Sequence, residues 1–593
     1  MPEPVLTVYP ARSVITMNPS FPRAEAVAVR GDRIVEVGSL ASMKPWFDAH
    51  EHIVDERFAN NVIVPGFIDP HLHPTMAAVL LPMNFVTATE WKLPWGTVSA
   101  STTADAFFAR VTEIEAATDD PEEPVFIWGY HQLWHGPMSR PLLNKINDAR
   151  PIIVWHRSFH ELYLNDGALK WLEITEAEAS NRKQIDYPNG HFFESGLGYA
   201  VNRLNPHILA PERYAEGLER LKQVVHFGGH TTIADMATGL FDFDAEWLML
   251  KQVIERKDTP FRVELVPDAA RLRAAKGSNE EVLAFAKSLP EQNTHRLRFS
   301  DHVKLFADGA FFSQLAQLQE PGYIDGHHGE WITPPEKLED AMRTYWNAGF
   351  KIHLHVTGDL GVELGLDLLE KLQWERPRFN HGFTFEHFGF STPEQIERIA
   401  KLGANVSANV YYLYELSDAY ARQGIGFERA SQMARLGACF ANGITTALHS
   451  DFTMAPAEPL NSAWVAVNRL NSSEKLMGPE ERITAEQALA AITINAARII
   501  GRADDIGSIR AGKKADFTVL RDDPLTTDPM RLKDIPIVAT VFEGRPSQSS
   551  AQTHDASHGP WRLSRRGQNH DHQWTAGELI RANRQPPYRG TGE

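Results

Sequence analysis

The chain has 593 residues, a formal net charge of −17 and a single cysteine, and 43% of its residues are hydrophobic. The acidic balance argues against a nucleic-acid-binding protein and against an anionic membrane surface as partner. One cysteine excludes an intrachain disulfide. The N-terminus shows no signal-peptide pattern, and the apolar runs are too short to span a bilayer. We therefore expect a cytoplasmic protein that acts on small molecules.

Both flanks of the chain have β character. Residues 1–64 are predicted to form short strands, and a Gly-Asp turn inside "AEAVAVRGDRIVEVGS" indicates a hairpin. The same character returns in residues 503–548, which contain "IGSIRAGKKADFTVL". We expect these two segments to build one small composite β-sandwich domain. Residues 549–593 are polar with mixed charge and are expected to be a C-terminal tail or arm.

Residues 65–502 alternate between short apolar runs and helix-like segments. Several of these helices begin at Thr or Pro and end at Gly, as helix caps do. Repeated β-α units of this kind predict a parallel sheet covered on both faces, and eight of them predict an α/β fold of the TIM type, a (β/α)8 barrel. A long insertion, rich in Trp and Pro, is expected at about 76–225, after the first strand. The eight expected strands lie at 65–70, 231–236, 261–266, 302–309, 350–356, 384–388, 404–409 and 445–451.

Side chains that bind metals stand at the ends of five of these expected strands. The first strand ends in "VPGFIDPHLHP", with two histidines one residue apart. In a barrel the chemistry sits at the carboxyl ends of the strands. Two side chains at i and i+2 on an extended segment point the same way, so both imidazoles can reach one ion. Neutral imidazole suits zinc and similar divalent ions. The strand-end residues are His71, His73, Lys304, His355, His387 and Asp451.

Other histidines need a separate interpretation, because random placement of 25 histidines would by itself produce about one His-x-His motif. His353, two residues before His355, is expected to be packed or to support a ligand. The pairs His131/His135 and His226/His230 have helical spacing and are interpreted as structural. His570 and His572 are expected in a solvated tail.

The motifs "VPGFIDPHLHP", "VKLFADGAF", "HLHVTGD", "FEHF" and "HSDFTMAPAEP" resemble the amidohydrolase superfamily, and within it amidohydrolase family 3, which includes YtcJ-like proteins and N-substituted formamide deformylases. The resemblance implies a metallohydrolase barrel with one or two divalent ions, zinc first. It implies that Lys304 is an N6-carboxylysine bridging two ions, although a salt-bridged or substrate-binding lysine is the alternative. It also suggests that His160 reaches the substrate from the insertion, against a structural role, with a weaker case for Glu194.

The expected function is hydrolysis of a non-peptide C–N bond, in a linear amide or an N-acyl or N-formyl amine. Asp451 is expected to be the general acid and base, taking a proton from metal-activated water and delivering it to the leaving nitrogen. The alternatives are a cyclic-amide hydrolase or deaminase on the same site, an isomerase or lyase, and a non-catalytic regulatory barrel. A homodimer is expected only because such assemblies are common.

Overall fold

The computed structural model describes residues 5–193 and 195–548. The expected tail 549–593, with His570 and His572, lies outside the described residues, and so does Glu194. Among the helices of the described residues, none is long and apolar enough to cross a membrane.

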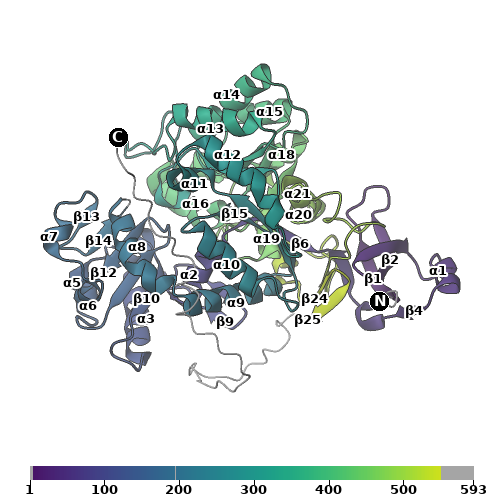
Figure 1. Cartoon of the computed structure of the whole chain (residues 1–593), viewed down its shortest axis with the longest axis horizontal. Coiled ribbons are helices and arrows are strands. Elements are labelled where there is room, and N and C mark those ends of the chain that lie inside the picture. The colour runs from purple at the N-terminus through teal and green to yellow at the C-terminus, as the bar shows by residue number, and fades with distance from the viewer. Residues whose placement is uncertain (1–4, 194, 549–593) are drawn as a thin grey trace, which may run out of the picture. The chain divides into compact units, whose positions relative to one another are not determined.

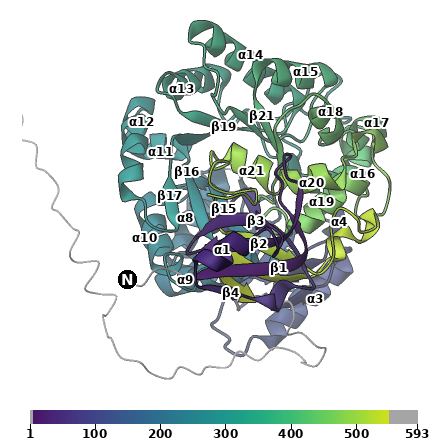
Figure 2. The ribbon, with the colours of Figure 1, turned by 90° about the vertical axis from the view of Figure 1, so that its right-hand side faces the viewer.

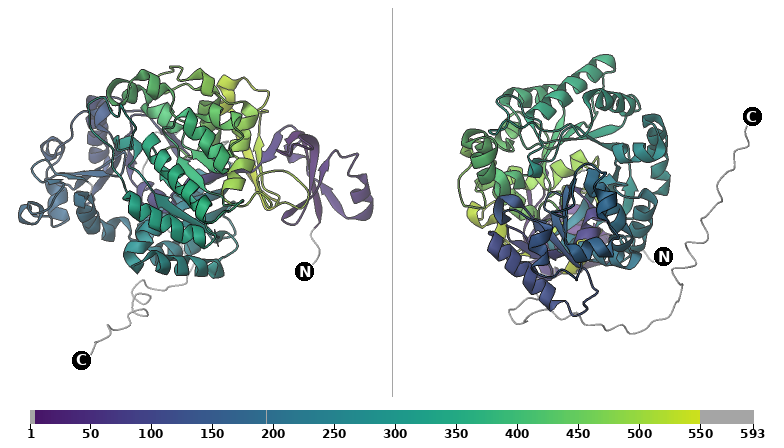
Figure 3. Two further views of the ribbon diagram at one scale, coloured as in Figure 1. Left: turned by 90° about the horizontal axis from the view of Figure 1, so that it is seen from above. Right: turned by 90° about the vertical axis from the view of Figure 1, so that its left-hand side faces the viewer.

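The two flanks of the chain meet in one eight-stranded sheet with the order β25-β24-β23-β5-β1-β2-β3, to which β4 is added beside β1. Figure 3 shows the N-terminal strands in purple next to the C-terminal strands in yellow, where β5 pairs with β23. Successive side chains of β2 alternate between two apolar clusters, so that Val27 and Val29 pack on one side and Ala26 and Ala28 on the other. The strands are β1 (Leu6–Ile15), β2 (Arg23–Arg30), β3 (Arg33–Gly38), β4 (His52–Val54), β5 (Val62–Pro65), β23 (Phe517–Leu520), β24 (Ile537–Phe542) and β25 (Arg545–Gln548).

The middle of the chain forms two runs of parallel strands. One has the order β17-β16-β15-β6 and the other β18-β19-β20-β21-β22. An isolated parallel bridge joins Asp268 to Lys304 between the two runs. Each of the eight expected strand segments overlaps one of these strands, and β17 is a ninth strand that was not expected. They are β6 (Phe67–Leu72), β15 (His230–Thr238), β16 (Arg262–Pro267), β17 (Leu297–Phe299), β18 (His302–Phe306), β19 (Lys351–Val356), β20 (Thr384–His387), β21 (Asn405–Ala408) and β22 (Thr446–Leu448).

Helices follow most of these strands and surround them (Figures 1 and 2). Their ends have the expected chemistry: Thr392 and Gln395 form a capping box at the start of α15, and Gly403 ends that helix in a left-handed conformation. The main helices are α9 (Pro211–Phe227), α10 (Phe243–Val253), α11 (Ala269–Lys276), α12 (Asn279–Ser288), α13 (Pro335–Asn347), α14 (Asp359–Glu375), α15 (Pro393–Leu402), α18 (Leu436–Ala441), α19 (Pro459–Asn468), α20 (Ala485–Ala491) and α21 (Ile494–Ile499).

The expected insertion carries a mixed sheet of its own, with the order β13-β14-β12-β11-β10-β7. Trp91 and Trp128 are fully buried and meet edge to face at 5.4 Å between ring centroids. They belong to an apolar cluster that the insertion shares with strands β15 to β17. The elements include β7 (Asn84–Phe85), β8 (Trp91–Leu93), β9 (Gly96–Val98), β10 (Val125–Tyr130), β11 (Ile152–His156), β12 (Glu161–Leu164), β13 (Ile185–Asp186), β14 (His191–Phe193), α2 (Pro74–Leu80), α3 (Ala104–Ala117), α6 (Asp166–Trp171) and α8 (Ser195–Ile208). The division of the chain into domains stays a prediction.

Candidate metal centre

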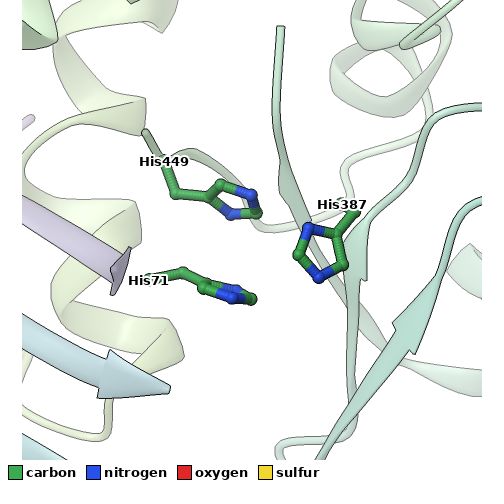
Figure 4. Close-up of side chains that lie close together, drawn as sticks. All are labelled: His71, His387 and His449. Atoms are coloured by element: carbon green, nitrogen blue, oxygen red, sulfur yellow. The ribbon is translucent and has the colours of Figure 1, made fainter. Parts of the chain in front are cut away.

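Three histidine rings converge at the carboxyl ends of three strands. His71 stands near the end of β6, His387 is the last residue of β20, and His449 directly follows β22. Figure 4 shows the three rings turned toward one common space. One ring nitrogen from each histidine lies within 4.8 Å of the others, which is a spacing that a single ion could bridge. All three side chains are almost completely buried.

Each of the three rings has one nitrogen without a hydrogen-bond partner in the described chain. Nε2 of His71, Nδ1 of His387 and Nε2 of His449 are buried and have no hydrogen-bond partner among the described residues. A buried polar atom without a partner costs free energy, so each one needs an explanation. A cation that accepts these lone pairs provides it.

Burial keeps the three imidazoles neutral. It lowers the pKa of His71 and of His387 well below the usual value, and it lowers the pKa of His449 to about 4. Nearby positive charge, from Lys304 among other groups, lowers the pKa of His71 and of His387 further. At neutral pH the cluster therefore presents the unprotonated form, which is the form that binds metal.

Two neighbouring side chains determine which nitrogen faces the cluster. Nδ1 of His71 lies 2.7 Å from Oε2 of Glu386, and Nδ1 of His449 lies 2.7 Å from the Ser407 hydroxyl. Since a carboxylate only accepts, His71 donates from Nδ1 and keeps the lone pair on Nε2. Glu386 is fully buried; burial alone would raise its pKa, but the hydrogen bond from His353 and the nearby positive charges hold that pKa below its usual value.

Asp451 joins the second histidine of the His-x-His motif to the cluster. Its Oδ1 is 2.9 Å from Nε2 of His73 and 3.5 Å from Nε2 of His71, and its Oδ2 is 3.5 Å from Nδ1 of His387. His71, His73 and Asp451 form a second group whose ligand atoms lie within 4.8 Å of one another. The backbone also holds this carboxylate in place, because the Asp451 N–H donates to the His71 carbonyl at 2.9 Å.

Two of these residues have a strained backbone. His387 has a φ of 71° and Asp451 a φ of 54°. Non-glycine residues rarely adopt this left-handed region, and where they do the surrounding structure holds them there at a cost of about 1–3 kcal/mol. Both strained residues are among those whose side chains converge on the common space.

The remaining predicted ligands lie beside this cluster but belong to neither group. The rings of His355 and His387 are 4.3 Å apart, and Nε2 of His355 has no partner among the described residues. Lys304 lies on β18, is completely buried, and its Nζ also lacks a partner in the described chain. Burial lowers the pKa of Lys304 to about 8, although Glu386 and Asp451 partly oppose the shift.

The predicted supporting residues fall in two places. His353 donates or accepts at both ring nitrogens, with Glu386 Oε1 at 2.6 Å and His302 Nδ1 at 2.8 Å, which fits a packed or supporting role rather than a ligand. His160 precedes β12 in the insertion and is half-buried. After burial and Lys304, His160 is among the groups that lower the pKa of His355.

The family model described as "Amidohydrolase family" matches residues 59–548. This chain belongs to the amidohydrolase family. It is a hydrolase acting on carbon–nitrogen bonds other than peptide bonds, and the family resemblance seen in its motifs is confirmed.

Full-length relatives agree with this assignment of the amidohydrolase, and a solved structure is similar in fold. Protein LONG AFTER FAR-RED 3 of Arabidopsis thaliana is 25% identical over 534 residues, which cover 86% of each chain. The N-substituted formamide deformylase of Arthrobacter pascens is 23% identical and covers 88% of this chain and 94% of its own. A crystal structure of an uncharacterized metal-dependent hydrolase from Pyrococcus horikoshii superposes with a TM-score of 0.69 at 20% identity, covering 88% of this chain and 99% of that one, which shows the same fold.

Two residues of the amidohydrolase's candidate site were missed by the sequence prediction. His449 is part of the three-histidine group, and Glu386 holds His71. The motif "HSD" did contain a signal for His449, because it stands two residues before Asp451, as His71 stands before His73. Glu386 immediately precedes His387, and no spacing rule marks it as the partner of a histidine on the first strand.

Proposed function

We propose that this amidohydrolase binds one or two divalent ions, zinc first, at the strand-end cluster and hydrolyses a linear amide or an N-acyl or N-formyl amine. The observation that carries the proposal is the set of neutral, buried imidazoles whose free nitrogens face one space. Imidazole with a carboxylate is a donor set that suits zinc. The proposed ligands are His71, His73, His355, His387, His449 and Asp451, with Lys304 as a bridging group.

A bound divalent ion supplies Lewis acidity toward the substrate carbonyl and toward water. The chain supplies the proton transfer. Asp451 is the proposed general base and acid, because its carboxylate lies among His71, His73 and His387 and is 5% exposed. It would take a proton as water attacks the carbonyl carbon, and return that proton to the nitrogen when the C–N bond breaks.

Lys304 is proposed to react with CO₂ and to become the carboxylated bridging residue. An ammonium group cannot act as a metal ligand, whereas the neutral amine can attack CO₂. With a pKa lowered to about 8 by burial, about a tenth of Lys304 is neutral at pH 7. Its Nζ has no hydrogen-bond partner among the described residues, so no salt bridge competes for it. The salt-bridged alternative has correspondingly less support.

The proposed substrate class rests on the family and on the name of the formamide deformylase relative. His160 is the proposed substrate contact from the insertion, because it is half-buried and contributes to the lowered pKa of His355. The cytoplasmic location and the homodimer stay predictions, as do the deaminase, cyclic-amide and regulatory alternatives.

We also propose that the two runs of strands close into the (β/α)8 barrel. Two sets of contacts support closure. The bridge between Asp268 and Lys304 links β16 to β18, and the hydrogen bonds from Asp451 N to His71 O and from His73 N to Phe452 O link the end of β22 to that of β6. The composite β-sandwich domain is proposed on the shared sheet of both flanks.

The first test is elemental analysis of protein purified without a tag and without added metal, beside the His71→Ala/His73→Ala variant. We expect one or two equivalents of zinc or a similar ion in the wild type and a large loss in the variant. The same preparations are then assayed with N-formyl and N-acyl amines, with Asp451→Asn added. That variant should keep metal on the three histidines but lose about 100- to 10,000-fold in kcat. Wild-type protein that stays metal-free after reconstitution would refute the proposal.

A further inference from the structure

A buried arginine of the insertion contacts the loop that carries Asp451. Arg157 directly follows β11 and is 4% exposed. Its Nη1 donates to the carbonyl of Thr453 at 3.3 Å, and its Nη2 donates to the carbonyl of Met454. These acceptors stand two and three residues after Asp451, and the insertion therefore holds the proposed general base's own loop.

The same guanidinium reaches a third segment. Nη2 of Arg157 donates to both carboxylate oxygens of Glu415, at 3.0 and 3.2 Å. Glu415 lies in a π-helical turn, Tyr412–Leu416, that follows β21, and it is itself 5% exposed. π-helical turns are rare and often mark functional sites. One side chain thus ties the insertion to the loops after two neighbouring strands.

Three aromatic rings enclose the Arg157 guanidinium. Its central carbon is 4.7 Å from the Trp128 ring centroid, 5.3 Å from that of Trp91 and 4.9 Å from that of Phe312. Trp91 also packs against Phe452, the residue after Asp451, at 6.1 Å. Aromatic faces and a carboxylate compensate a buried cation, and the planar fork of donors serves several acceptors at once. A lysine could neither stack in this way nor span the same acceptors.

The loop that carries Asp451 needs stabilising contacts because its backbone is strained. Asp451 has a φ of 54°, and a strained conformation persists only where neighbouring contacts determine it. On one side the loop is bound to the first strand, through Asp451 N to His71 O and His73 N to Phe452 O, each at 2.9 Å. On the other side the contacts at Thr453 and Met454 come from Arg157.

We propose that Arg157 is a positioning residue, which fixes the carboxylate of Asp451 for proton transfer by clamping the 453–454 backbone to Glu415 and to the insertion. This inference rests on the proposed function of Asp451. It assigns the insertion a part in the reaction beyond the proposed contact of His160 with the substrate. Arg157 has its hydrogen bonds to protein atoms and does not itself touch the reacting atoms.

The test compares Arg157→Lys with Arg213→Lys. Arg213 in α9 stacks over Phe126 at 4.9 Å, and its Nε and one Nη have no partner among the described residues, so it controls for removing a guanidinium from an aromatic contact. We expect Arg157→Lys to lower kcat about 10- to 100-fold with KM and metal content within twofold of wild type. Hydrogen exchange of peptides covering 450–456 should be faster in this variant and unchanged in Arg213→Lys.

Glu415→Gln is the second variant, used if Arg157→Lys does not fold, and it should shift kcat and loop exchange in the same direction. Unchanged exchange at 450–456 in the folded variants would overturn the proposal. So would a fall in activity that merely follows a loss of metal, because Arg157 would then act through metal binding and not through the proton transfer by Asp451. Wild-type protein without metal or amidase activity would refute the proposed function, whereas the exchange rates, which need no substrate, would still decide whether Arg157 holds the loop.

Discussion

Two groups of buried histidines in this amidohydrolase differ in what their ring nitrogens contact. In the insertion, His131, His135 and His156 have partners at both nitrogens: His156, for instance, contacts the Ser158 hydroxyl and Gln132 Oε1, each at 2.7 Å. At the strand ends, His71 and His449 have one nitrogen held by the protein and the other without a partner in the described chain. Burial lowers the pKa of every one of these histidines. Neutrality alone is therefore no sign of a ligand. An unpartnered nitrogen alone is no sign either, because His226, His230 and His302 in the described chain each have one. What marks the strand-end group is that several such nitrogens lie within reach of one ion.

The largest expected contrast comes from removing one ring of each group. His449→Ala takes one of three converging imidazoles away and should weaken metal binding at least about 100-fold. His156→Ala should leave metal binding unchanged but lower the free energy of unfolding by about 1–3 kcal/mol, because Gln132 and Ser158 lose their buried partner. Metal titrations and urea unfolding of both variants measure this contrast. If both variants lost metal equally, the distinction between the insertion histidines and the strand-end histidines would be wrong.

A smaller effect is expected from the carboxylate that orients His71. Glu386→Gln keeps an oxygen that accepts from Nδ1 but removes the negative charge, and we expect metal affinity to fall about 10- to 100-fold. The matched control is Glu246→Gln. Glu246 is also buried, but its carboxylate accepts hydrogen bonds from the backbone N–H groups of residues 239–242. Removing the charge of Glu246 should therefore lower the free energy of unfolding without changing metal affinity. Competition with a chelator of known affinity measures the metal affinity of both variants.

The sequence predicts much of this site because strand periodicity and strand ends are local features. His71 and His73 share a face by their spacing. Lys304 lies on an expected strand, His387 ends one, and Asp451 follows shortly after one. Hydrogen-bond partners are not local. Spacing alone makes His131 and His135 look as suitable for a metal as the strand-end pair.

The residues that were missed have their decisive contacts far along the chain. Glu386 contacts His71 across 315 positions, and Arg157 contacts Glu415 across 258. The internal sheet of the insertion likewise pairs strands in an order, β13-β14-β12-β11-β10-β7, that periodicity does not determine. Such pairings depend on packing between segments, which the sequence pattern of either segment does not contain.

The smallest predicted effect uses pH to separate the two groups. Burial lowers the pKa of His135 to about 4, against about 6.5 for an unfolded chain. The unfolded state therefore binds a proton first, and the stability that His135 contributes is present above pH 6.5 and is lost as the pH falls toward 4. His135→Gln should reduce the difference in unfolding free energy between pH 7 and pH 5 by about 2 kcal/mol.

Urea unfolding at the two pH values measures this difference, with His50→Gln at an exposed position as the control. The effect of His135→Gln should be the same in metal-free and metal-loaded protein, because both nitrogens of His135 are bonded to the protein and no ion competes with protons there. At the strand-end cluster, by contrast, bound metal competes with protons for the free lone pairs. If metal abolished the acid sensitivity that His135 confers, the insertion histidines would be ligands as well, and the distinction between the two groups would be wrong.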